Sequence, residues 1–207
     1  MMDGMPMANS YETFEEKIRR LATYSEQYDT VTLNEIVAIL GSSSNYVIIL
    51  FLVTPFLQPI PLFGLSTLSG FLIMVSSGLI MAKKPFFLPK FAKRHVLKGS
   101  TLYAICQKLL AIFEMTKKWL HRRGRFMSRH ILMRWINGAL IGALGIALAL
   151  PLPIPFTNTL PSISIATLCL GALKEDGMII AAGWAFSILT AAYFATLMAL
   201  PLHVVFE

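Results

Sequence analysis

Two Pro-Ile-Pro tripeptides interrupt long apolar runs of this sequence, at residues 59–61 and 153–155. Two prolines at i and i+2 end a helix, because proline lacks its N–H and blocks the carbonyl one turn earlier. Hydroxyl and amide side chains follow each break, where loose carbonyls and new helix N-termini favour the binding of ions or polar solutes. The predicted binding residues are Pro59, Pro61, Ser66, Thr67, Pro153, Pro155, Asn158 and Ser162.

Residues that would support an enzyme are missing from the sequence. It contains no Asp-x-Asp, Gly-rich phosphate loop or HExxH motif, and no Ser/His/Asp set. The four histidines are scattered, and Cys106 and Cys169 have no metal-like His or Cys neighbour, so we expect both to be free thiols. The sequence therefore predicts no enzymatic activity, no metal and no cofactor.

The composition predicts an integral membrane protein. The chain of 207 residues is 56% hydrophobic and 14% charged, whereas soluble proteins are about one quarter charged. Residues 42–82 and 135–173 contain no Lys, Arg, Asp or Glu, and residues 178–202 form a third uncharged run. One crossing needs roughly 20 apolar residues, so the first two runs are each long enough for a hairpin and the third for one span.

The basic residues predict the orientation of the chain. Fourteen of the 18 Lys and Arg residues fall between Lys83 and Arg134, and basic connecting segments stay on the cytoplasmic side. We therefore expect residues 83–134 to be cytoplasmic. The net charge of +7 is explained by anionic lipid headgroups, so we expect no nucleic-acid partner.

These patterns divide the chain into five segments of an all-α membrane protein. The first is a cytosolic N-terminal region of amphipathic helices, the second and fourth are helix–Pro-x-Pro–helix repeats, the third is a basic amphipathic cytosolic segment, and the fifth is a last transmembrane helix with its tail. Their bounds are residues 1–41, 42–82, 83–134, 135–173 and 174–207.

Local signals place helices outside the apolar runs. Thr32, Glu35 and Gly41 have the spacing of a capping box and a C-cap around a short helix. Phe14, Ile18 and Leu21 recur at helical spacing among charges. The two patterns predict helices before residue 42.

The basic segment also has helical periodicity. Six apolar residues recur near the 3.6-residue period and predict one amphipathic helix. That helix lies at the membrane interface, packs on the membrane domain, or belongs to a cytosolic helical hairpin. The six residues are Leu102, Ile105, Leu109, Ile112, Phe113 and Trp119.

The position of the breaks in the membrane has two interpretations. The breaks are either outer turns of complete hairpins or tips of re-entrant loops near the midplane, where their polar groups would line a site. The basic segment offers no good crossing between the repeats, which favours breaks that arrive from the same side. In the second repeat, Gly138, Gly142 and Gly145, with nearby alanines, indicate either close helix–helix contact within the protein or between subunits, or simply the Gly- and Ala-rich composition of membrane helices.

An acidic residue before the last apolar run has two interpretations as well. Asp176 either caps the N-terminus of the final helix, where anions are favoured, or pairs with Arg125 or Arg129 of the basic segment and gates the cytosolic face.

The apolar strings around the breaks resemble the ExoD family. The resemblance covers roughly residues 30–200, and its most specific pieces are Pro59-Ile60-Pro61 with Ser66, Pro153-Ile154-Pro155 with Pro161, and Gly171 followed by Asp176-Gly177. It differs where the family usually has an arginine before Asp-Gly, because Glu175 stands there. The resemblance implies a multi-pass protein of the bacterial inner membrane, linked to exopolysaccharide production and alkaline tolerance, and it transfers no catalytic residue.

Two functions fit these observations. The first is a transporter- or channel-like protein with its polar site at the two breaks. The second is a non-catalytic scaffold that organises exopolysaccharide or envelope machinery through its basic segment. The expected partners are the bilayer with its anionic headgroups, a second copy in a homo-oligomer, and the exopolysaccharide machinery.

Overall fold

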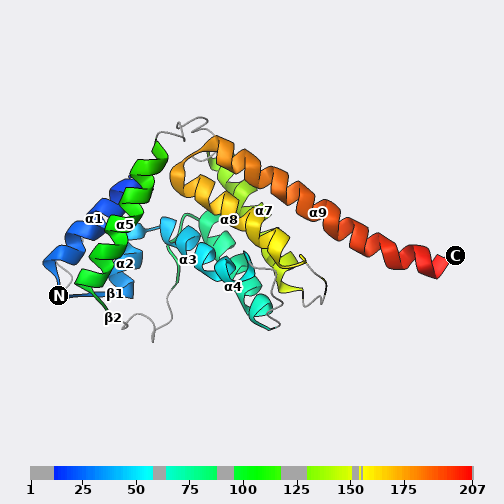
Figure 1. The fold of residues 1–207 in the computed structure, drawn as a ribbon, viewed down its shortest axis with the longest axis horizontal. Helices are drawn as coiled ribbons and strands as arrows, with labels where there is room; N and C mark the ends of the chain where they lie inside the picture. The colour runs from blue at the N-terminus through cyan, green and yellow to red at the C-terminus, as the bar shows by residue number, and fades with distance from the viewer. Residues whose placement is uncertain are drawn as a thin grey trace. The chain divides into compact units, whose positions relative to one another are not determined.

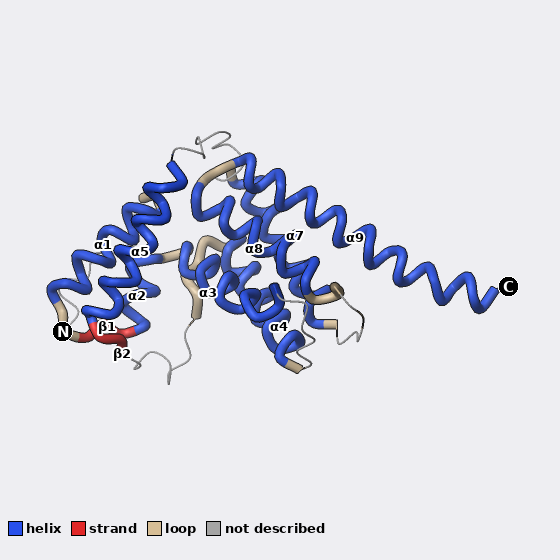
Figure 2. Tube along the Cα trace, viewed as in Figure 1, coloured by secondary structure: helices blue, strands red, loops and turns tan. Residues whose placement is uncertain are grey.

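In the structure, a computed structural model, the regular elements of the described residues are helices and one short two-stranded ribbon (Figures 1 and 2). The structure describes residues 12–57, 64–87, 96–117, 130–150, 154 and 156–206. Within these ranges the elements are α1 (Phe14–Gln27), β1 (Thr30–Thr32), α2 (Leu33–Leu40), α3 (Ser43–Val53), the 3₁₀ helix η1 (Thr54–Leu57), α4 (Leu65–Met81), β2 (Val96–Lys98), α5 (Gly99–Lys117), α7 (Ile131–Ala149), α8 (Thr159–Lys174) and α9 (Gly177–Phe206).

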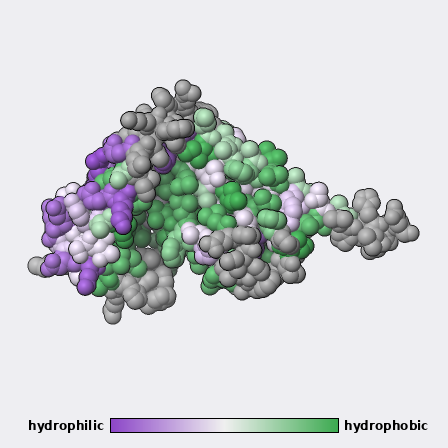
Figure 3. Space-filling view, in the orientation of Figure 1, coloured by the Kyte–Doolittle hydropathy of each residue, from purple (hydrophilic) through white to green (hydrophobic). Residues whose placement is uncertain are grey.

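The chain divides into two compact units. Unit 1 consists of Met1–Asn45 and Lys83–His121, and unit 2 consists of Tyr46–Ala82 and Arg122–Glu207. The N-terminal region and most of the basic segment, which the sequence pattern separates, thus share one unit. Figure 3 shows hydrophilic surface gathered over α1 and α5 of unit 1 and hydrophobic surface over unit 2.

Unit 1 is built on α1 and α5, which pack against each other. They run antiparallel, because Gly99 at the start of α5 approaches the end of α1 while Glu114 pairs with Arg19 near its beginning. The buried face of α1 includes Phe14, Ile18 and Leu21, as their spacing predicts. The buried side chains of α5 are those of Leu102, Cys106 and Leu110.

The register of the α5 face differs in part from the sequence-based prediction. Leu102 is buried as expected, but Ile105 is 47% exposed. The buried positions Leu102, Cys106 and Leu110 are spaced four residues apart. The buried residue after Leu102 is therefore Cys106, and not Ile105 as the periodicity predicted.

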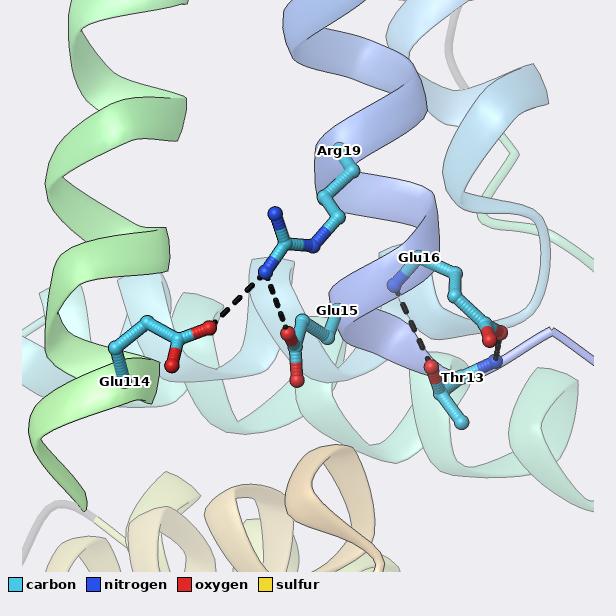
Figure 4. Close-up of polar contacts among 5 residues, drawn as sticks. All are labelled: Thr13, Glu15, Glu16, Arg19 and Glu114. Carbon is cyan, nitrogen blue, oxygen red and sulfur yellow. Dashed lines mark hydrogen bonds and ion pairs between the residues drawn. The ribbon is translucent and has the colours of Figure 1, made fainter. Parts of the chain in front are cut away.

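Capping boxes start both helices of the N-terminal region. At α2, Thr32 and Glu35 exchange hydrogen bonds with each other's backbone, and Gly41 ends the helix with a φ of 56°, which confirms the predicted signals. At α1, Thr13 and Glu16 form a second capping box, which was not predicted (Figure 4).

An exposed ion-pair group joins the two long helices of unit 1. The Arg19 guanidinium contacts Glu15 at 2.9 Å within α1 and Glu114 at 3.0 Å on α5 (Figure 4). Exposed pairs of this kind contribute little stability, so the apolar face holds α1 on α5 and the charges keep the outer surface hydrophilic.

A two-stranded antiparallel ribbon was not foreseen by the all-helical prediction. Thr30 pairs with Lys98 and Thr32 with Val96. The side chain of Val31, between the paired positions, is fully buried. The ribbon joins segments more than sixty residues apart and closes unit 1 at the ends of α1 and α5.

Hydrogen bonds tie the end of the first segment of unit 1 to the start of its second segment. Asn45 Nδ2 donates to the Lys84 carbonyl at 2.8 Å, and the Phe86 N–H donates to Ser44 Oγ at 3.1 Å. The buried Lys17 Nζ also donates to the Leu40 carbonyl and to the Ser43 hydroxyl. All of these residues belong to unit 1, so the bonds join α1, the end of α2 and residues 84–86 within that unit.

Unit 2 contains two antiparallel helix pairs, α4 with α7 and α8 with α9. The first pair is close because glycines meet: a Cβ added at Gly70 would lie 2.4 Å from the Gly145 carbonyl oxygen, and one at Gly142 would lie 2.7 Å from Ser77 Oγ. The predicted glycine face of residues 138–145 therefore makes contact within the protein. In the second pair, Gly171 and Gly183 allow the same close approach.

Two helices of unit 2 are long and apolar enough to cross a membrane, Ile131–Ala149 and Gly177–Ala199. A bent pair, Leu33–Leu40 with Ser43–Leu57, raises the number to three among the described residues if it counts as one span. Two further apolar helices, α4 and α8, are shorter. Large apolar side chains are exposed on these helices, including Phe71, Ile146 and Ile188, as expected of surfaces that face lipid.

Candidate functional site at the helix breaks

The helix ends beside the two Pro-Ile-Pro breaks come together in unit 2. Thr67 Oγ1, in the first turn of α4, donates a hydrogen bond of 3.1 Å to the carbonyl of Ala149, the last residue of α7. The first break precedes α4 and the second follows α7, so their flanks are direct neighbours. We call this region the break end of unit 2 and define it as residues 54–57, 64–67, 149–150 and 156–162.

The prolines of both breaks lie outside the described residues. Pro59, Pro61, Pro153 and Pro155 therefore remain predicted site residues without a described geometry. The structure does describe the polar candidates that follow them. Their burial and hydrogen bonds can be compared with the prediction.

The polar candidates after the first break differ in exposure. The Ser66 side chain is buried, whereas Thr67 lies at the surface and binds α7 as described above. Gly64, directly before α4, has a φ of 83°. This left-handed backbone suits glycine, because a Cβ would be strained there.

The polar candidates after the second break have unsatisfied atoms. Asn158 Oδ1 and Ser162 Oγ are both buried, and neither has a hydrogen-bond partner among the described residues. Asn158 occupies the N-cap position of α8, yet its side chain makes no capping bond. Ser162, one turn later, is fully buried. Buried polar atoms are nearly always paired with protein or ordered water, so both atoms are candidates to bind a polar group.

The backbone around the second break is strained at one position. Phe156 has a φ of 67°, a conformation that costs about 1–2 kcal/mol for a residue with a side chain. Its carbonyl accepts from the Leu160 N–H, and Thr157 Oγ1 donates to the Ile154 carbonyl. Pro161 falls in the first turn of α8, where its missing N–H leaves no helical bond unmade. The strained turn thus sets where α8 begins and where Asn158 and Ser162 lie.

The chemistry of the break end is that of uncharged hydrogen bonding. Residues 54–67 and 149–162 contain no Asp, Glu, Lys, Arg or His. The N-termini of α4 and α8 supply backbone N–H donors and a positive dipole end, and the end of α7 supplies carbonyls. This set of groups can bind and orient a polar solute, but it offers no general acid or base.

Charged residues gather at the opposite ends of the same helices. Lys83 follows α4, Arg134 lies in the first turn of α7, and Lys174 ends α8. Asp176 begins α9: its Oδ1 accepts from the backbone N–H of Met178 at 2.8 Å and of Ile179 at 3.4 Å. Asp176 thus has the geometry of an N-cap.

The alternative role of Asp176 involves residues that the structure does not describe. Arg125 and Arg129 lie outside the described residues, so their pairing with Asp176 and its gating role remain predictions.

Two polar contacts inside unit 2 were not predicted. Trp184 Nε1 on α9 donates to Asn137 Oδ1 on α7 at 2.8 Å. The hydroxyls of Ser164 on α8 and Thr190 on α9 are 3.0 Å apart. A polar residue inside an uncharged run is the only sequence signal for such contacts, because each partner lies 26 or more positions away.

No group of three or more His, Cys, Asp or Glu residues that could hold a metal occurs in the described part of the chain. Cys106 and Cys169 are both free, as predicted, and both are buried. Cys106 belongs to α5 of unit 1, and Cys169 lies inside the core of unit 2. Neither therefore adds a reactive thiol to the candidate site.

Comparison with known proteins identifies the family. Residues 14–196 match a family described as "Exopolysaccharide synthesis, ExoD". The chain is 33% identical over 170 residues to Protein ExoD of Rhizobium meliloti (strain 1021), an alignment that covers 82% of this chain and 71% of the relative. It is 30% identical over 161 residues to an uncharacterized protein of Synechocystis sp. (strain ATCC 27184 / PCC 6803 / Kazusa), covering 77% and 75% of the two chains. No solved structure matches it. The family model spans nearly the whole of both units, and the chain belongs to the ExoD family, which is linked to exopolysaccharide synthesis.

Proposed function

We propose that this ExoD-family chain is a multi-pass protein of the bacterial inner membrane that acts as a transporter or channel, with its polar site at the break end of unit 2. The observation that carries the proposal is the pair of buried atoms Asn158 Oδ1 and Ser162 Oγ, which have no hydrogen-bond partner among the described residues. An unpaired polar group in an apolar environment costs several kcal/mol. A water molecule or a polar solute at these atoms would remove that cost.

Helix lengths favour one of the two interpretations of the breaks. The 17 residues of α4, the 19 of α7 and the 16 of α8 correspond to about 25, 28 and 24 Å of helix. A hydrocarbon core is about 30 Å thick. If the charged ends lie at one membrane face, the break end lies near the opposite face and well past the midplane. The breaks then form the turns of nearly complete hairpins, and the polar site lies close to the membrane surface.

The orientation follows from the basic residues. The positive-inside rule puts the basic residues of 83–134, and with them unit 1, on the cytoplasmic side. The break end then faces the periplasm. Since its groups bind without acid–base chemistry, the proposed activity is passage of a solute and not a chemical reaction.

A second candidate function is a non-catalytic membrane scaffold. It is favoured by unit 1, which has its own buried core and a hydrophilic surface that could dock envelope or exopolysaccharide machinery (Figure 3). The scaffold and the transporter differ in one testable property. Only the transporter needs a water path to Ser162.

The test is cysteine accessibility at the break end. In full-length protein with C106S and C169A, single S162C and N158C substitutions are treated in sealed vesicles of known orientation with a charged methanethiosulfonate reagent. The control is S76C on α4, because Ser76 is equally buried and donates to the Leu72 carbonyl of its own helix. We expect labelling of both break-end cysteines from the periplasmic side and none of the control.

Failure to label S162C and N158C from either side would refute the water path and leave the scaffold. Labelling from the cytoplasmic side alone would refute the proposed orientation. A flux measurement in proteoliposomes then identifies the solute, with S162A expected to reduce flux and S76A to leave it unchanged.

A further inference from the structure

Unit 1 contains a surface pocket that the proposed transport function does not use. It has a volume of about 640 Å³ and lies where the end of α1, the ribbon and the start of α5 meet. Small-molecule sites typically measure about 300–1,000 Å³. The lining residues are Ser25, Glu26, Tyr28, Asp29, Thr30, Lys98, Ser100 and Tyr103.

One glycine allows the backbone contact beside the pocket. A Cβ added at Gly99 would lie 2.1 Å from the Tyr28 carbonyl oxygen and 2.5 Å from that of Ser25. The Gly99 N–H also donates to the Asp29 carbonyl at 2.8 Å. Together with the pairing of Thr30 and Lys98, these contacts hold the end of α1, both strands and the start of α5 together around the pocket.

The charges of the lining restrict the class of ligand. Glu26 and Asp29 provide two carboxylates and Lys98 one ammonium, all on exposed side chains. The two carboxylates would repel a phosphate-rich ligand, and the ammonium would repel a polycation. A neutral ligand with many hydroxyls satisfies all three groups, because each hydroxyl both donates to a carboxylate and accepts from a lysine.

The aromatic side chains supply the remaining element. The Tyr28 ring packs against Tyr24 with a centroid distance of 4.6 Å and a tilt of 33°, and Tyr28 is still 51% exposed. Tyr103 lines the pocket from α5. A sugar ring has an apolar C–H face that packs on such an aromatic surface while its hydroxyls reach polar neighbours.

We propose that this pocket of unit 1 is a binding site for a neutral saccharide unit. Glu26 and Asp29 accept hydrogen bonds from its hydroxyls, Lys98 donates to its oxygens, and Tyr28 packs against its ring. The site is independent of the transport proposal, because all of its residues belong to unit 1 and none to the break end.

The test uses the full-length protein in lipid nanodiscs without glucoside or maltoside detergents, which would themselves compete. Saturation-transfer NMR measures binding of glucose, galactose, glycine betaine and inorganic phosphate. We expect saturable binding of at least one sugar, stronger than that of betaine or phosphate. D29N should weaken sugar binding about tenfold or more, since it removes hydrogen bonds to a charged group. E114Q serves as the control, because Glu114 is an exposed carboxylate of unit 1 outside the pocket.

Three results would overturn the proposal. They are the absence of saturable binding of both sugars, equal affinity in D29N and the native protein, and tighter binding of betaine or phosphate than of either sugar. Y28L offers a second variant if D29N does not fold, as judged by circular dichroism, and it should also lose sugar binding. Retention of full affinity in Y28L would contradict the packing of the ring on Tyr28.

Discussion

The close contact between α4 and α7 leads to a prediction that can be tested with two glycines of one helix. A Cβ at Gly70 would lie 2.4 Å from the Gly145 carbonyl oxygen and 2.8 Å from Ala149 Cβ. A Cβ at Gly78, eight residues along α4, would have no neighbour within 4 Å. Substitution by alanine raises helix propensity by about 1 kcal/mol at either position. Because both variants gain the same helix propensity, the difference between their free energies of unfolding gives the steric cost at Gly70.

The magnitude follows from the contact distances. Ordinary van der Waals contact begins near 3.4 Å, so G70A forces α4 and α7 apart by roughly 1 Å or displaces backbone. Overpacking of this kind costs about 1–3 kcal/mol. We expect G70A to be less stable than G78A by that amount. The assay is reversible unfolding in mixed micelles with a rising fraction of sodium dodecyl sulfate, followed by circular dichroism.

A rescue experiment distinguishes a local clash from general destabilisation. A Cβ at Gly142 would lie 2.7 Å from Ser77 Oγ but 3.6 Å from Ser77 Cβ. G142A should therefore destabilise the protein, and S77A in the same chain should restore most of the loss. Equal stability of G70A and G78A, or no rescue in the double variant, would refute the described packing of α4 on α7.

Three further predictions concern the other parts of the chain. K17M should lower the free energy of unfolding of unit 1, measured by thermal unfolding, by about 1.5–3 kcal/mol per lost charged hydrogen bond. K108M is the control and should have no such effect, because Lys108 lies on the exposed surface. Equal effects of the two substitutions would contradict a role for the Lys17 ammonium. D176A should lower the free energy of unfolding by about 0.5–2 kcal/mol, because it removes the N-cap of α9. D176S should retain most of the stability, because serine is also an N-cap residue. An equal loss in both variants would contradict capping. Burial raises the pKa of the Cys106 thiol to about 11, so its alkylation in a C169A chain should be slow at pH 7 and accelerate up to pH 11 as the thiolate forms; a rate that levels off near pH 9 would contradict this environment.

Local features of the fold could be predicted from the sequence. The capping box at Thr32 and Glu35 depends on residues three positions apart, and the glycine face of α7 on spacings of three and four. Both are properties of a single helix. The ribbon between Val31 and Leu97 could not be predicted in this way, because it pairs segments that tertiary packing brings together and has only three residues per strand.

The candidate site was predictable in its residue types and not in its geometry. Hydroxyl and amide residues after each proline break indicated Thr67, Asn158 and Ser162. The sequence does not encode locally that Thr67 bonds to Ala149, or that Asn158 Oδ1 and Ser162 Oγ have no hydrogen-bond partner among the described residues. These facts depend on how α4, α7 and α8 pack, which is a property of the whole of unit 2.

The packing that stabilises unit 2 also brings the flanks of the two breaks together. α4 and α7 are antiparallel, and the contact of Gly70 with Gly145 fixes their register. Once that register is fixed, Thr67, three residues before Gly70, must face Ala149, four residues after Gly145. Stability and site geometry are therefore coupled through the same helix contact. Any substitution that moves α4 away from α7, such as G70A, should break the Thr67–Ala149 bond and change the accessibility of S162C, whereas G78A should leave both unchanged.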